Sequence, residues 1–121
     1  MQYVMLIYTN TQRWAELSKD ERNRVHADCG AWHDDLVQKG HGRGAMALQP
    51  ISTATTLGEK NGETVIMDGP FAETKEVLGG FEMLECKDLD EAIGIAKRFP
   101  ALRVGSLVEV RPVLAGGECR D

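Results

Sequence analysis

The residues from Gln2 to Tyr8 (QYVMLIY) constrain the fold most, because they are apolar and β-prone at nearly every position. Such a strand suits the centre of a sheet that is covered on both faces better than a sheet with one face in water. The chain must therefore supply, or recruit, a cover for each face of that sheet.

The first candidate cover is a helix over residues 18–39. Ser18 and Glu21 form an S-x-x-E capping box at its start, and Gly40 supplies a left-handed stop at its end. Apolar side chains recur along this segment at helical spacing, which predicts a buried stripe of Val25, Cys29, Trp32 and Leu36.

A second helix follows the same logic near the C-terminal end. Asp88 is placed to cap it, Glu91 is placed to reach back, and Pro100 is expected to close it. The apolar stripe predicted for this helix is Leu89, Ala92, Ile93 and Ala96.

Three further strands and one hairpin complete the pattern. The strands are expected at 45–49, where Pro50 ends the pairing, at 78–86 and at 106–113. β-Branched residues at 53–57 and 63–67 flank an Asn61-Gly62 turn, which is typical of a β-hairpin outside the main sheet.

The resulting order predicts a ferredoxin-like α+β fold: two βαβ-type halves with an inserted hairpin. We expect a single domain over residues 1–114 and a Gly-rich, flexible tail over 115–121. Both helices would cover one face of the sheet, which leaves apolar residues on the other face. We therefore predict a homodimer in which two sheets pack face to face, giving a dimeric α+β barrel.

Composition narrows the class of protein. The formal net charge is -5 and the basic residues are scattered, so the sequence predicts no direct nucleic-acid binding. No stretch is apolar enough for a membrane span or a signal segment, which favours a cytoplasmic protein. Three widely spaced cysteines fit neither a disulfide framework nor a zinc ribbon, and we expect free thiols.

The loop after the hairpin is the first candidate site. Asp68 ends a strand and precedes Gly69-Pro70, so its carboxylate is either a general base or ligand anchor in a cleft, or the cap of its own Asx-turn. Phe71 is expected to plug the core. Glu73 and Lys75 present opposite charges in the same loop, where they either bind a polar ligand or are solvated.

Two other positions complete the candidate set. His33 borders the predicted helical stripe, where it is either a proton-transfer group or a boundary histidine bonded to backbone or water. Arg111 follows Glu109 by two residues on the last strand, so both side chains would point away from the helices. Arg111 either clamps an anionic ligand or forms an ion pair with Glu109 or Asp68.

Cofactor and metal chemistry find little support in the sequence. His26, Cys29 and His33 share one arc of a helix, but at about 1.5 Å rise per residue the two histidines are about 10 Å apart along its axis. Joint chelation of one zinc ion is then difficult, and we predict no metal. No P-loop, dinucleotide fingerprint or nucleophile elbow occurs, and we predict no cofactor.

Nearly the whole chain resembles a known family. The stretch DGPFAETKE at residues 68–76, Leu78-Gly79-Gly80-Phe81, DLDEA at 88–92 and EVRP at 109–112 are similar to the DGPF branch of the YCII-related proteins. The resemblance implies the dimeric α+β barrel and no particular reaction. Relatives of the YCII type are proposed enzymes with a His and Asp pair, whose histidine would fall near Cys29 or Gly30 here.

Two functions remain open from the sequence. The first is a small-molecule site in a barrel cleft, with cofactor-independent acid–base catalysis by Asp68 and His33 and ligand binding by Glu73, Lys75 and Arg111. The second is a non-enzymatic ligand-sensing or protein-interaction module. The family resemblance adds a link to an extracytoplasmic-function sigma factor.

Overall fold

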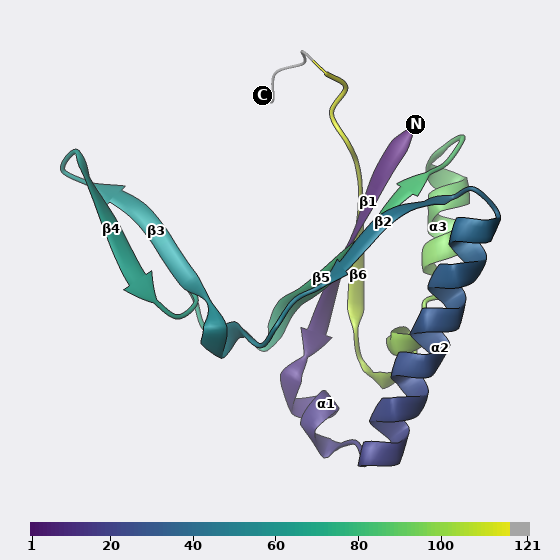
Figure 1. Cartoon of the computed structure of the whole chain (residues 1–121), viewed down its shortest axis with the longest axis horizontal. Coiled ribbons are helices and arrows are strands. Elements are labelled where there is room, and N and C mark those ends of the chain that lie inside the picture. Colours follow the sequence, from purple (N-terminus) through teal and green to yellow (C-terminus); the bar gives the residue numbers. More distant parts are fainter. Residues whose placement is uncertain (117–121) are drawn as a thin grey trace.

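The structure is a computed structural model, and it describes residues 1–116. Figure 1 shows a sheet with helices on one side and a hairpin that stands away from it. The strands are β1 (Gln2–Asn10), β2 (Gly42–Ala47), β3 (Thr55–Lys60), β4 (Glu63–Asp68), β5 (Glu76–Glu85) and β6 (Leu107–Pro112). The helices are α1 (Thr11–Glu16), α2 (Lys19–Gln38) and α3 (Leu89–Ala96), with short 3-10 helices η1 (Ile51–Thr53) and η2 (Pro100–Val104).

The main sheet has the strand order β2-β5-β1-β6, with antiparallel pairing throughout. This is the arrangement of a ferredoxin-like fold, and it confirms the predicted α+β class with β1 at the centre. Met5 of β1 lies opposite Glu82 of β5, and the next residue, Leu6, lies opposite Glu109 of β6. The side chains of neighbouring residues of β1 thus point to opposite faces of the sheet.

The capping box of α2 forms as predicted. The Ser18 hydroxyl accepts a hydrogen bond from the Glu21 backbone N–H at 3.1 Å, and the Glu21 carboxylate accepts one from the Ser18 backbone N–H at 2.9 Å. This bonding holds the pKa of the Glu21 carboxyl below its ordinary value. The helix ends at Gln38, and Gly40 follows with φ +80°, a left-handed conformation that glycine tolerates.

The α3 segment differs in two ways from the prediction. Asp88 caps it by accepting from the Glu91 N–H at 2.9 Å, but the Glu91 carboxylate accepts from Lys87. The helix ends at Ala96, and Pro100 begins η2 instead of closing α3, because proline suits the first position of a helix.

The core lies between the sheet and α2, α3 and η2. The predicted stripe of α2 is confirmed, because Val25 and Leu36 are buried while Cys29 and Trp32 pack at its margin. The predicted stripe of α3 is confirmed at Ala92 and Ala96 but not at Leu89 and Ile93, which are 46% and 37% exposed. The buried side chains there are Ala92, Ile95 and Ala96, followed by Phe99.

Several strand boundaries also differ from the predicted ones. β2 begins at Gly42, three residues before the predicted start, because the His41 N–H bonds to the Leu36 carbonyl and turns the chain into the sheet at once. β3 begins at Thr55 because η1 occupies the preceding residues. The short helix α1, which the sequence pattern did not predict, is capped by Asn10.

The predicted hairpin exists and forms its own two-stranded sheet of β3 and β4. Asn61 and Gly62 both have positive φ, 54° and 80°, as a type I′ turn requires. Neither strand joins the main sheet. Within residues 1–116, none of the helices is both long and apolar enough for a membrane span.

Candidate acid–base site

His33 and Glu82 form a polar pair in which the carboxyl group is buried. His33 lies on α2 and Glu82 on β5, and the distance from His33 Nδ1 to Glu82 Oε1 is 2.7 Å. Glu82 has the same parity as the core residue Leu84, so its carboxylate points from the sheet towards the helices. The strand and the helix thus bring together two residues that are distant in sequence.

The two members of the pair differ in exposure. The Glu82 side chain is 4% exposed and the His33 side chain 34% exposed. Burial raises the pKa of the Glu82 carboxyl, although the hydrogen bond and the charge of His33 act in the opposite direction. The imidazole therefore reaches solvent with one edge and rests on a buried carboxyl group with the other.

The sequence interpretation did not include Glu82, although a signal was present. A charged residue at the inward-facing parity of an otherwise apolar strand requires a buried partner. His33 borders the apolar stripe of the helix that covers this strand. The proton-transfer and the boundary-histidine alternatives for His33 both stay open, but its partner is a side-chain carboxyl rather than backbone or water.

Asp68 does not join this pair. It is the last residue of β4, lies opposite Thr55 and is exposed. The turn after it is held by a bond from the Gly69 N–H to the Ala54 carbonyl at 2.7 Å and by one from Thr56 Oγ1 to the Gly69 carbonyl at 2.8 Å. Within residues 1–116 its carboxylate has no hydrogen bond or ion pair. Phe71, expected in the core, is 85% exposed because this loop follows the hairpin away from the sheet.

Glu73 and Lys75 are exposed, and the loop that carries them ends beside a hollow at the edge strand β6. The hollow holds about 570 Å³ and is lined by Tyr8, Thr74, Glu76, Leu107, Val108 and Glu109. Thr74, between the two charged residues, reaches it directly. The DGPF-type loop therefore ends beside a concave surface, although Asp68 is not part of its lining.

Arg111 lies on β6, which also supplies Leu107, Val108 and Glu109 to the lining of this hollow. Its Nη1 atom is 3.8 Å from Glu109 Oε1, and both side chains are more than half exposed. The predicted direction of the two side chains is confirmed, since Val108 and Val110 of the same strand pack against the core. The ion-pair alternative with Glu109 is the one that the structure contains.

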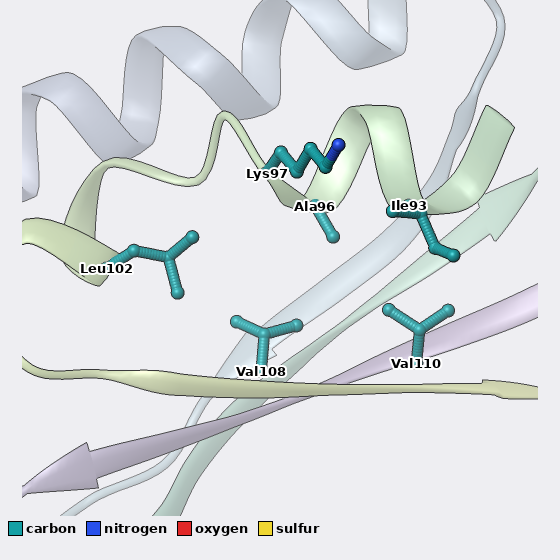
Figure 2. A pocket seen from close by; sticks show the side chains of 6 residues that line it. All are labelled: Ile93, Ala96, Lys97, Leu102, Val108 and Val110. Carbon is teal, nitrogen blue, oxygen red and sulfur yellow. The ribbon is translucent and has the colours of Figure 1, made fainter. Parts of the chain in front are cut away.

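A second hollow lies between α3 and β6. Figure 2 shows Val108 and Val110 pointing from β6 towards Ile93 and Ala96. The hollow holds about 340 Å³, and its lining includes Leu102 and a single charged residue, Lys97. No carboxylate, imidazole or thiol lines it, so its surface is suited to apolar contact and not to proton transfer.

One cluster has metal-binding residue types. Donor atoms of His41, Cys86 and Glu91 lie within 4.8 Å of one another. Two of the three already have structural partners: His41 Nδ1 lies 2.9 Å from the Glu85 carbonyl, and Glu91 Oε1 accepts from the Lys87 N–H at 3.0 Å. Burial and nearby carboxylates raise the pKa of the Cys86 thiol, which favours the protonated form over the thiolate that metals bind.

These features define a class: a small ferredoxin-like α+β protein with a buried acid–imidazole pair and one open sheet face. Residues 1–115 match the YCII-related domain, and the chain belongs to that family. An uncharacterised protein of Rhizobium meliloti is 41% identical over 97 residues, which are 80% of this chain and 78% of that protein.

A solved structure shares the fold. It is a 5-chloro-2-hydroxyhydroquinone dehydrochlorinase from Burkholderia phenoliruptrix in complex with 2,5-dihydroxybenzoquinone. The superposition covers 96% of each chain with a TM-score of 0.54 and 17% sequence identity. This likeness supports the barrel-type α+β fold and, at that identity, nothing about the reaction.

Proposed function

We propose that the protein is a cofactor-independent acid–base enzyme that acts on a small polar organic molecule, with His33 as the proton-transfer group. The observation that carries the proposal is the 2.7 Å contact between His33 Nδ1 and the buried carboxyl of Glu82. A carboxyl behind an imidazole fixes the ring orientation and its tautomer, as in catalytic triads on unrelated folds.

His33 and Glu82 have different roles in the proposed proton transfer. Nδ1 faces Glu82, so the other ring nitrogen, Nε2, is left to accept a proton from a substrate and to return it. Imidazole is the side chain whose charge changes most readily near neutral pH. Glu82 is a positioning residue, because its burial keeps it from the substrate while its carboxyl group stabilises the charged ring that forms during proton transfer.

The other predicted site residues are proposed to bind a ligand at a second surface, because Arg111 points away from the helices whereas His33 lies on α2. Lys75 and Arg111 suit anionic groups, and Glu73 suits hydrogen-bond donors. Thr74, between Glu73 and Lys75, lines the hollow beside β6. Asp68 is proposed as a second acid–base group or anchor that acts at an interface between copies. The structural relative is named for a chlorinated, hydroxylated aromatic compound, which supports small hydroxylated aromatics and carboxylates as the first compounds to test.

The main test is a thermal-shift screen of such compounds, followed by mass-spectrometric detection of turnover for each hit. We expect His33→Asn to lower turnover by about 100-fold or more, the usual range for loss of a general acid–base group. Glu82→Gln, which retains an acceptor for the ring N–H, should lower it less and change its pH profile. Asp68→Asn is included to test the proposed anchor.

The matched control is His26→Asn on the same helix, where His26 packs edge-on against Trp14 and not against Glu82. Equal turnover by wild-type protein and His33→Asn would overturn the proposal. Compounds that bind without any turnover would favour the alternative of a non-enzymatic ligand-sensing or protein-interaction module. Membership of the DGPF branch and a link to a sigma factor also remain proposals, and the exposed hairpin is the surface that such a partner would use.

A further inference from the structure

The hollow between α3 and β6 is a concave apolar surface that the proposed acid–base function does not use. Figure 2 shows Ile93, Ala96 and Lys97 of α3 on one side of it and Val108 and Val110 of β6 on the other. Its volume of about 340 Å³ lies at the lower end of the range of about 300–1,000 Å³ found for small-molecule sites. The hollow therefore has room for one small ligand.

The chain does not fill this space with its own side chains. Ala96, which is buried, contributes only a methyl group to the lining. Two larger apolar side chains of the lining, Ile93 and Leu102, are 37% and 38% exposed. Contact with the hydrocarbon part of a ligand would remove this apolar surface from water, which is favourable.

Lys97 is the charged residue of the lining. It is the C-cap of α3, the position that Lys39 has on α2. Lys39 Nζ pairs with Asp35 at 2.9 Å, whereas the residue four positions before Lys97 is the apolar Ile93. Within residues 1–116 the Lys97 ammonium group has no ion pair or side-chain hydrogen bond. It is therefore free to pair with an anionic ligand.

We propose that this hollow binds an aliphatic monocarboxylate of short to medium chain length, with its chain against Val108 and Val110 and its carboxylate at Lys97. The uncharged residues of the lining are all aliphatic, so they offer an aromatic ring no stacking partner. A lysine ammonium is a compact point charge on a flexible stem, which suits a single carboxylate at the mouth of an apolar site.

This site goes beyond the proposed acid–base function. The pair of His33 and Glu82 lies between α2 and β5, whereas no imidazole, carboxyl or thiol group lines the hollow between α3 and β6. We therefore expect the aliphatic carboxylate to be bound there without being converted.

The test is a titration of the full chain with sodium octanoate, followed through ¹³C-labelled methyl signals in NMR spectra. We expect saturable shifts of the Ile93, Val108 and Val110 methyl signals, and smaller shifts at Val25 beneath α2. From butanoate to octanoate the affinity should rise about two- to fourfold for each added methylene, fourfold being the gain for complete burial.

Lys97→Gln tests the charge. Lys97 is exposed, so this variant should fold as the wild type does. It should weaken octanoate binding about two- to fivefold, the range for an exposed ion pair. The matched control, Lys39→Gln at the corresponding position of α2, should leave the affinity unchanged. 1-Octanol, which has the same chain length without the charge, should bind wild-type protein and Lys97→Gln equally.

Three results would overturn the proposal: shifts that do not saturate, an unchanged octanoate affinity in Lys97→Gln, or an equal loss of affinity in both lysine variants. Octanoate binding by His33→Asn should match that by wild-type protein. Failure of this site and failure of the proposed acid–base function are therefore distinguishable, because octanoate binding and turnover are measured separately.

Discussion

Glu82 and Glu109 sit opposite adjacent residues of β1, yet they lie in different environments. Glu82 faces the helices, is almost fully buried and contacts His33 at 2.7 Å, whereas Glu109 faces outward and lies 3.8 Å from Arg111 with both side chains exposed. The residue type is the same, and both strands pair with β1. The face of the sheet, and not the carboxylate itself, thus decides which pair is suited to proton transfer.

The largest difference between the two faces should be in packing. Leu84 is fully buried beneath the helices, so Leu84→Ala should lower the free energy of unfolding by about 2–5 kcal/mol. Leu107→Ala on the open face should cost less than about 1 kcal/mol in a monomer. Urea unfolding of both variants across protein concentrations measures this. A cost for Leu107→Ala that grows with protein concentration would sharpen the comparison by showing that a second copy covers the open face.

The next effect concerns the buried pair itself. Glu82→Ala removes the partner of His33 and leaves a void, and it should cost about 1–3 kcal/mol of unfolding free energy. Glu82→Gln keeps an acceptor for the ring and should cost less. Chemical denaturation at neutral pH gives both values. If Glu82→Ala were no more costly than Glu109→Ala, the distinction between the two faces would be lost.

The pH dependence of stability follows from the direction of the Glu82 pKa. Burial raises that pKa above the ordinary value of 4.5, so the folded protein retains this proton to higher pH than the unfolded chain does. Relative to Glu82→Gln, wild-type stability should therefore fall as pH rises above about 4.5, by less than about 1.4 kcal/mol per pH unit. Denaturation curves between pH 4 and 7 measure the trend, and a rise with pH would contradict it.

The smallest effect is expected at the exposed pair. Arg111→Ala should change the free energy of unfolding by about 0–1 kcal/mol, because an exposed ion pair at 3.8 Å is hydrated and screened by salt. Comparing unfolding in low and high salt provides the check. A larger loss that appears only at high protein concentration would indicate that Arg111 has a partner on a second copy.

Regular patterns in the sequence predicted most of the body. The capping box at Ser18, the stripe through Val25 and Leu36 and the Asn61-Gly62 turn are local signals, and each formed as expected. The end of α3 and the exposure of Phe71 were wrong because both depend on where later residues pack. Spacing alone does not fix which arc of a short helix meets the sheet.

The sequence predicted less of the candidate site than of the fold. His33 was identified from its position beside an apolar stripe, but its partner, Glu82, is brought to it only by the antiparallel pairing of β5 with β1 beneath α2. The loop at Asp68 was predicted to be a candidate site because of its charged residues and its turn. Its exposure depends on the hairpin standing away from the main sheet, which no local pattern encodes.

The closed base of the hairpin has a consequence for folding kinetics. β2 and β5 pair directly with each other, and the bond from the Gly69 N–H to the Ala54 carbonyl brings the two ends of the excursion together. Closing a longer loop costs only about 0.6 kcal/mol for each doubling of its length. The four-stranded body can thus reach its transition state with the hairpin still unordered. Mutations in the hairpin should then leave the refolding rate of the body almost unchanged.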